Sequence, residues 1–229
     1  MAAIDFGACI LFTDAPVRPA DPRIRIVPIA RLASAAAYSQ FMLGGLADHV
    51  TTPHCLIVQW DGHVLRPGAW DPAFLAHDYV GASWPQFGDG HDVGNGGFSL
   101  RSLRLLRACR AGGLAGHPED VVIARQHRAW LEQQGLHFAD RALADRFSAE
   151  RAGDPLASFG FHGVWHMPHV LGVERFWQIY RTLDERSTIR QDLTSLLQQV
   201  ARGRGGMARV FTMLKGCAMD SIQIRNRPA

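Results

Sequence analysis

The chain has 229 residues, of which 47% are hydrophobic and 20% are charged, so its composition is that of an ordinary globular protein rather than a disordered one. The formal net charge is only +3 and the basic residues are scattered, which argues against a nucleic-acid partner. No apolar run approaches the roughly 20 residues of a membrane-spanning helix and no signal peptide is recognisable, so we expect no membrane span and a cytoplasmic location.

The first part of the chain predicts alternating strands and a helix. A continuous apolar run over residues 7–12 predicts a strand covered on both faces, and alternation over residues 23–27 predicts a second strand. Apolar residues at helical spacing predict a helix over residues 32–50, which Pro53 ends. Residues 54–60 then form the strongest strand pattern in the chain. This order of strand, helix and strand indicates an α/β sheet.

A polar segment, Gln59-Trp60-Asp61-Gly62, closes the strand predicted at residues 54–60. In open α/β sheets, ligands gather at the carboxyl ends of parallel strands, and Asp61 would lie at such an end. Aspartate followed by glycine is also an ordinary turn. Asp61 is therefore either a polar turn residue or a ligand for a metal ion or a phosphate.

The glycine-rich segment over residues 93–102 is the most distinctive part of the chain, because Gly94, Asn95, Gly96 and Gly97 stand directly before a strand-like run. Glycine lets the backbone pass close to a ligand, since it has no side chain. The segment lacks the lysine of a P-loop and the GxGxxG spacing of a dinucleotide site. It is either a tight structural turn or the wall of a pocket, in which case exposed aromatic rings beside it would stack on a base or sugar. The candidate rings are Trp60, Tyr79, Trp84 and Phe98.

Two acidic residues, Glu119 and Asp120, follow Pro118 and predict the start of a helix that runs to residue 135. Acids at a helix start are stabilised by the helix dipole, by only about 0.3–1 kcal/mol where they are exposed. A carboxylate held there also stays ionised and could act as a general base toward a hydroxyl group. Both interpretations remain open from the residues alone.

The second half of the chain predicts a strand over residues 159–166 and two amphipathic helices, near residues 170–180 and 189–200. The segment after residue 206 gives no clear pattern. Histidines gather near the predicted strand but lack the HExxH spacing of a zinc site, and the cysteines lack CxxC pairs. The histidines are His162, His166 and His169, and the cysteines are Cys9, Cys55, Cys109 and Cys217.

Six motifs resemble those of an uncharacterised, glycosyltransferase-like domain family, over a block from about residue 7 to residue 163. They are QWDG at 59–62, DYVGASW at 78–84, VGNGGFSLRS at 93–102, EDVVIA at 119–124, FADRALADRFSAE at 138–150 and FGFHG at 159–163. More distantly, this layout is similar to metal-dependent inverting glycosyltransferases of the GT-A fold, in particular the galactosyltransferase and fringe-like groups. The resemblance implies transfer of a sugar from a nucleotide-diphosphate donor to a saccharide or other hydroxyl acceptor.

The resemblance also implies roles for single residues. Asp120 is expected to be the base with Glu119 beside it, and Asp61 and His162 are expected to hold a divalent cation, Mn²⁺ or Mg²⁺. Because two ligands share one ion, the Asp61 and His162 side chains should lie within about 6 Å of each other. The expected substrate-binding residues are Gln59, Trp60, Asp78, Trp84, Asn95, Gly96, Gly97 and Phe98.

The expected fold is α/β, with a GT-A-like mixed sheet flanked by helices over residues 1–169 and a helical extension over residues 170–229 that packs on the same domain. The chain departs from the similar enzymes in two ways: the DxD metal motif is reduced to the single Asp61, and the chain begins at what resembles the second strand. These departures keep a second interpretation open, a degenerate and non-catalytic module that binds a sugar or sugar nucleotide. A metallohydrolase built on the histidines is disfavoured, because no matching carboxylate motif accompanies them.

Overall fold

The structure, a computed structural model, describes residues 4–183 and 186–225 of a mixed α/β protein. The chain divides into two compact units, residues 1–59 with 63–161 and residues 60–62 with 162–229. The main segment of the second unit begins at residue 162, whereas the sequence places the boundary between residues 169 and 170. Residues 1 and 229, the outer bounds of the predicted domains, lie outside the described residues. The packing of the helical extension on the α/β domain stays a prediction.

The first unit opens with two parallel strands, β1 (Cys9–Thr13) and β2 (Ile24–Pro28), in which Cys9 lies opposite Ile24. The predicted coverage of β1 on both faces is wrong. None of its residues is fully buried, and Leu11 is 42% exposed. The sheet that contains β1 has only two strands, β1 and β2. Strand β1 therefore lacks the second neighbouring strand that a central strand of a larger sheet has.

Helix α1 (Ala35–Leu43) follows and is shorter than the helix predicted over residues 32–50. It begins where the Ser34 side chain accepts a hydrogen bond from the Ala37 N–H at 3.1 Å. Such a cap satisfies a backbone donor that the first turn cannot pair internally. A short 3-10 turn, η1 (Gly45–Asp48), continues the predicted segment.

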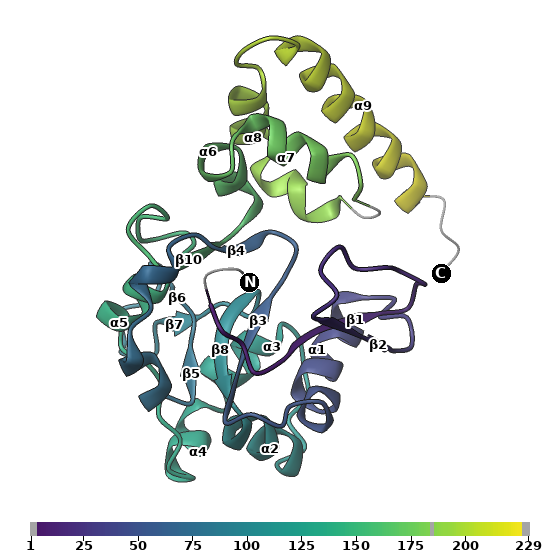
Figure 1. Cartoon of the computed structure of the whole chain (residues 1–229). Coiled ribbons are helices and arrows are strands. Elements are labelled where there is room, and N and C mark those ends of the chain that lie inside the picture. The colour runs from purple at the N-terminus through teal and green to yellow at the C-terminus, as the bar shows by residue number, and fades with distance from the viewer. Residues whose placement is uncertain (1–3, 184–185, 226–229) are drawn as a thin grey trace. The chain divides into compact units, whose positions relative to one another are not determined.

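The central sheet of the first unit has the order β3 (His54–Val58), β8 (Phe98–Ser102) and β5 (Tyr79–Val80). Figure 1 shows the three strands side by side. Both pairings are antiparallel, so His54 lies opposite Ser102 and Val58 lies opposite Phe98. The parallel neighbours expected for the strand before Asp61 are therefore absent from this sheet.

Strand β8 is buried along its whole length, and its alternation separates two kinds of side chain. Phe98 and Leu100 belong to an aromatic core cluster on one face, where Phe98 packs against Phe147 and Phe159. Ser99 and Arg101 point to the opposite face, by the alternation of a strand. A buried arginine on that face requires polar partners, and these build the site described below.

The remaining elements before residue 163 are short, and two of their residues, Gly62 and His162, belong to the second unit. The strands are β6 (Ala82–Ser83) and β7 (Val93–Gly94), which pair antiparallel, and β4 (Gly62–Val64), β10 (Gly160–His162) and β9 (Ser148–Ala149), which form a sheet in the order β4-β10-β9. The helices are α2 (Leu103–Ala111), α3 (Glu119–Val121), a π-helical turn η4 (Val122–Gln126), α4 (Arg128–Gln133) and α5 (Arg141–Phe147). The 3-10 turns η2 (Pro67–Ala69) and η3 (Pro72–Ala76) precede β5.

The second unit is helical after β10. Its elements are η5 (Val164–His166), α6 (Met167–Val170), α7 (Val173–Tyr180), η6 (Ser187–Asp192), α8 (Leu193–Val200) and α9 (Gly206–Arg225). The helices predicted near residues 170–180 and 189–200 are confirmed. Helix α9 lies within the helical extension predicted over residues 170–229, although no separate helix was predicted there. Across the described residues, no helix combines the length and apolar character that a membrane crossing requires.

Candidate functional site

The glycine-rich segment forms a fixed turn between β7 and β8. Asn95 has φ of 67°, in the left-handed region that asparagine tolerates better than most residues. Its side-chain oxygen Oδ1 accepts a hydrogen bond from the Gly97 N–H at 3.0 Å, and its carbonyl accepts one from the Tyr79 hydroxyl at 3.0 Å. The Gly97 carbonyl accepts a hydrogen bond from the Gln59 N–H at 2.8 Å. One of these bonds lies within the turn, and two other chain segments, at Tyr79 and Gln59, hold it in place.

Arg101 is the centre of the polar network beneath the turn and is 0% exposed. Its Nη2 lies 2.9 Å from Glu119 Oε1 in a buried ion pair, and its Nε donates to the Ser99 hydroxyl at 3.0 Å. Nη2 also donates to the Gly96 carbonyl at 3.4 Å, and the guanidinium lies 5.4 Å from the centre of the Tyr79 ring. Buried charges persist only when they are paired and hydrogen-bonded, so the ion pair ties the turn to helix α3.

Asp120 stands next to this pair at the first turn of α3 and is partly exposed. Its Oδ2 accepts a hydrogen bond from the Gly96 N–H at 3.1 Å, and its Oδ1 accepts one from the Val121 N–H at 2.8 Å. Burial raises the pKa of Asp120 because it disfavours the charged form, and the negative charge of Glu119 raises it further. A raised pKa and a fixed orientation are the properties of a carboxylate that can take up a proton.

Tyr38 of α1 completes the electrostatic surroundings of the two acids. Burial raises its pKa to about 12, and the Glu119 charge adds to this effect. Its hydroxyl therefore stays protonated at neutral pH. The π-helical turn η4 begins directly after α3, and such turns are frequent at functional sites.

The room left by Gly96 is taken up by the protein itself, so the expectation that it clears space for a sugar is wrong. A Cβ at Gly96 would overlap Glu119 Oε1 and would lie 3.1 Å from Arg101 Nη2. In the same way, a Cβ at Gly94 would overlap the Trp84 indole. Glycine is needed at both positions because internal groups pack against the backbone.

We expect Gly96→Ala to lower the free energy of unfolding by about 1–3 kcal/mol, the usual cost of overpacking a buried site. Urea unfolding of the wild type and the variant measures this loss. Gly88→Ala is the matched control, because a Cβ at Gly88 would meet no atom within 4 Å. Its change should stay within about 0.5 kcal/mol. Equal stability of Gly96→Ala and wild type would show that the Arg101–Glu119 pair does not press against this glycine.

The aromatic side chains expected to stack on a ligand belong to the core instead. Phe98 is 0% exposed among Phe147 and Phe159, and Trp84 is 7% exposed within a second hydrophobic cluster that also contains Tyr79. Neither Phe98 nor Trp84 offers a ring face to a ligand, so these two expectations are wrong. Trp60 is half-buried in the second unit.

Asp78 lies away from the glycine-rich turn and serves the fold. Its Oδ1 accepts a hydrogen bond from the Ser102 hydroxyl at 2.5 Å, and its Oδ2 accepts one from the His137 N–H at 2.9 Å. Ser102 lies opposite His54, at the far end of the central sheet from the turn. Asp78 and Asn95 therefore lie at opposite ends of the sheet, and substrate binding by Asp78 stays a prediction.

The expected approach of Asp61 and His162 is confirmed. His162 Nε2 lies 3.3 Å from Asp61 Oδ1, and both residues belong to the second unit. The Asp61 carbonyl also accepts a hydrogen bond from the Gly163 N–H at 3.1 Å, which fixes the segment. Although Oδ1 is at ion-pair distance from the imidazole, it is buried without a hydrogen bond of good geometry. Among the described residues, no group of three or more histidine, cysteine or acidic side chains is arranged to hold a metal ion.

The sequence did not identify Arg101, Tyr79, Ser99 or Tyr38 as part of this network. A signal for the first of these was present, because an arginine alternates with apolar residues in the strand-like run FSLRS. A charged side chain in a buried strand calls for an opposite charge nearby, and Glu119 is such a charge.

Comparisons with known proteins identify one family. A family model described as "Protein of unknown function (DUF5672)" matches residues 21–162, more than half of the chain. This match includes the glycine-rich turn, Arg101, the two acids of α3 and His162. No curated protein matches the chain, and no solved structure matches it.

Proposed function

We propose that this chain, which belongs to the DUF5672 family, transfers a sugar from a nucleotide-diphosphate donor to an acceptor hydroxyl with inversion, and that it has a GT-A-like fold. The observation that carries the proposal is the state of Asp120. This carboxylate is partly exposed, is oriented by two backbone N–H groups and has a raised pKa. These properties suit a general base.

In the proposed reaction, Asp120 takes the proton of the acceptor hydroxyl. The acceptor oxygen then forms a bond to the anomeric carbon of the sugar while the bond from that carbon to the diphosphate oxygen breaks. The electron pair of the broken bond leaves with the diphosphate. Attack from the face opposite the leaving group inverts the configuration, so no covalent sugar intermediate on the protein is required.

In this proposal Glu119 and Arg101 do not contact the substrate. They set the orientation and the pKa of Asp120. Glu119 is 4% exposed and its Oε1 is engaged by Arg101. Its negative charge keeps the pKa of Asp120 above the ordinary value, after the larger effect of burial. The pair also holds the Gly96 backbone, whose N–H orients Asp120.

Two further buried donors favour a polar ligand near the turn. Asn95 Nδ2 and Arg101 Nη1 have no hydrogen-bond acceptor within the part of the chain that the structure describes. Unpaired buried donors are uncommon in folded proteins, and oxygen atoms of a ligand would satisfy them if the turn opened toward it.

Asp61 and His162 fit a divalent cation as two of its ligands. The buried Asp61 Oδ1 lacks a hydrogen bond, and an imidazole nitrogen faces it, which are donor types that Mn²⁺ accepts. Sites of this kind usually complete their coordination with water and substrate phosphates. A bound ion would neutralise charge on the departing diphosphate.

We expect the wild type to bind Mn²⁺ in the absence of any donor, and Asp61→Asn to weaken this binding at least 10–100-fold, roughly the loss seen when even an outer-shell partner is removed. Electron paramagnetic resonance of free Mn²⁺ measures the affinity without an activity assay. Asp14→Asn is the control, because Asp14 is exposed and faces only Arg31 at 3.9 Å. Similar Mn²⁺ affinity in all three proteins would exclude Asp61 as a ligand.

The second candidate function is a sugar or sugar-nucleotide binding module without turnover. The observation that favours it is the lack of a third metal-ligating side chain beside Asp61 and His162 among the described residues. A screen of nucleotide-diphosphate sugars with Mn²⁺ separates the two candidates. Release of nucleoside diphosphate supports the transferase, whereas saturable calorimetric binding without release supports the module. Absence of both binding and release across the panel would contradict both.

A further inference from the structure

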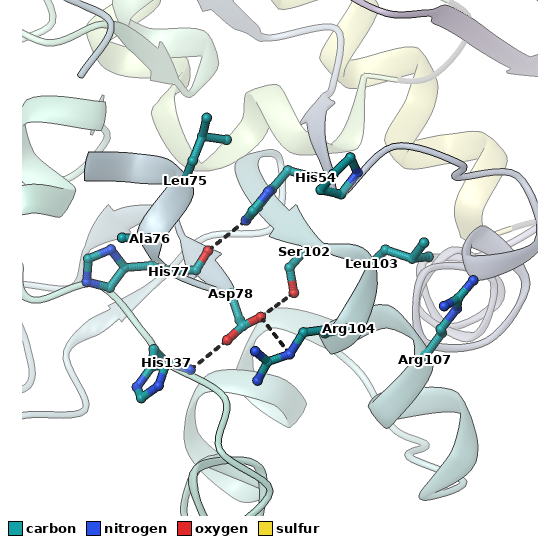
Figure 2. A pocket seen from close by; sticks show the side chains of 11 residues that line it. His54, Leu75, Ala76, His77, Asp78, Ser102, Leu103, Arg104, Arg107 and His137 are labelled. Carbon is teal, nitrogen blue, oxygen red and sulfur yellow. Dashed lines mark hydrogen bonds and ion pairs between the residues drawn. The ribbon is translucent and has the colours of Figure 1, made fainter. Parts of the chain in front are cut away.

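A cavity of about 300 Å³ lies at the end of the central sheet that the proposed reaction does not use (Figure 2). It is placed where β3 begins at His54 and where β8 ends at Ser102. The glycine-rich turn lies at the other end of these strands, because it comes directly before β8 and is hydrogen-bonded to Gln59, which follows β3. Each strand has five residues, which separates the two places by roughly 14 Å at about 3.4 Å per residue.

An arginine that lines this cavity has no counter-charge. Arginine recurs at every third position from residue 101 to residue 110. Three of these have a carboxylate partner: Arg101 has Glu119, Arg104 has Asp78 at 3.8 Å, and Arg110 has Asp48. Arg107 is exposed and has neither an ion pair nor a hydrogen bond within the described ranges. Arg104 and Arg107 lie on one face of α2, where like charges three residues apart repel each other.

The single acid of the cavity does little to offset these charges. Asp78 is 5% exposed, and its oxygens accept hydrogen bonds from the Ser102 hydroxyl and the His137 N–H. Its distance of 3.8 Å from Arg104 Nε is long for a strong pair. The Arg104 side chain is instead held by its Nη2, which donates to the Gly135 carbonyl at 2.7 Å.

Three histidine rings also line the cavity wall. His54 Nε2 lies 3.1 Å from the His77 carbonyl, and His77 Nδ1 lies 3.0 Å from the Ala73 carbonyl, so both rings are held in place. The third ring is that of His137 (Figure 2). The ring N–H groups of His54 and His77 are thus donated to the backbone, so Arg104 and Arg107 are the groups of this wall that would pair with an anion.

Arg104 and Arg107 also line a second hollow of about 450 Å³. Its wall is more apolar and includes Trp130, Leu136 and Ala108. The same two cations therefore stand at the junction of a polar hollow and an apolar one. A ligand that spans both would carry a negative group at one end and an apolar body at the other.

We propose that these two hollows bind a small organic phosphate ester, with the phosphate between Arg107 and Arg104 and the organic part against Trp130. A phosphate supplies the counter-charge that Arg107 lacks, and the planar guanidinium can donate two parallel hydrogen bonds to it. This site is separate from Asp120 and does not depend on the proposed transfer reaction.

Isothermal titration calorimetry of the full-length protein with phenyl phosphate, inorganic phosphate and phenol tests the proposal. Phenyl phosphate should bind more tightly than inorganic phosphate, because only the ester also fills the apolar hollow, and phenol should not bind measurably. Arg107→Gln should raise the Kd for phenyl phosphate by about tenfold or more, the loss expected for a charge-assisted pair. Arg107→Lys should recover part of the affinity, because it restores the charge without the fork.

Arg110→Gln is the matched control, since it removes the same charge from the same helix but Arg110 pairs with Asp48 and does not line the cavity. It should change the Kd less than twofold. Circular dichroism confirms that each exposed substitution leaves the fold intact. The proposal is overturned by equal losses in the two glutamine variants, by equal affinity for the two phosphates, or by no binding to wild type at concentrations on the order of 10 mM.

Discussion

Replacing Arg101 by methionine is expected to lower the free energy of unfolding by about 3–5 kcal/mol, because it leaves the Glu119 carboxylate buried without its counter-charge. Glu119 is 4% exposed, so water cannot take the place of the guanidinium. The substitution also removes donors from the Ser99 hydroxyl and the Gly96 carbonyl. Methionine fills most of the volume that the arginine side chain occupies, so the loss reports mainly on charge and hydrogen bonding. Urea unfolding at neutral pH measures it.

A double variant separates the ion pair from other effects of the substitution. Arg101→Met combined with Glu119→Gln removes both charges, and it should recover a large part of the loss, since no unpaired charge stays buried. Arg110→Met is the matched control, because its partner Asp48 is exposed and such surface pairs contribute only about 0–1 kcal/mol. A loss for Arg101→Met no larger than that of Arg110→Met would show that Glu119 is not held as the structure places it.

The positions of many elements follow from local sequence, whereas their pairing does not. The strand before Gln59 and helix α7 lie close to their predicted ranges, because periodicity and end signals are local. The antiparallel pairing of β3 with β8 joins residues that are between 40 positions apart, as Val58 and Phe98 are, and 48 positions apart, as His54 and Ser102 are. The continuous apolar run of β3 is typical of a strand in a parallel sheet, but β3 is only half-buried and its partner runs antiparallel.

Members of the candidate site could be predicted where a residue type that suits the chemistry stands at a recognisable point of the sequence, such as the start of a helix. The helix start at Pro118 pointed to Asp120, and the shared cation that the resemblance implies pointed to the approach of Asp61 and His162. Predictions failed where a residue's purpose depends on what packs against it. In the sequence, Phe98 suggests a ring that stacks on a ligand, but in the structure it packs against Phe159. Gly96 suggests space for a ligand beside the backbone, but Glu119 occupies that space.

Asp120→Asn is expected to lower kcat by a factor on the order of 10²–10⁴ while the fold and donor affinity are retained, if Asp120 is the base of the proposed transfer. Asparagine can keep one hydrogen bond from the Gly96 or Val121 N–H through its carbonyl oxygen, but it cannot take up a proton. The pKa of Asp120 is raised by burial and by Glu119, so the base is lost by protonation at a higher pH than for an exposed aspartate. In the pH profile of kcat/KM, the fall of activity on the acid side should therefore occur at a higher pH than the pKa of an ordinary aspartate would give. The residual activity of the variant should not show this fall.

Asp89→Asn is the control for the pH profile. The side-chain hydrogen bond from Arg125 lowers the pKa of Asp89 to about 2, so this exposed carboxylate stays ionised throughout the range of the assay. Its replacement should leave both kcat and the fall of activity on the acid side unchanged. A helix cap without a catalytic role would respond differently at position 120, since Asp120→Asn would then shift the melting temperature by a few degrees and leave turnover nearly intact. If the wild type turns over and Asp120→Asn gives that result, the general base is another carboxylate. If the variant loses both kcat and the fall of activity at acid pH, Asp120 is the base.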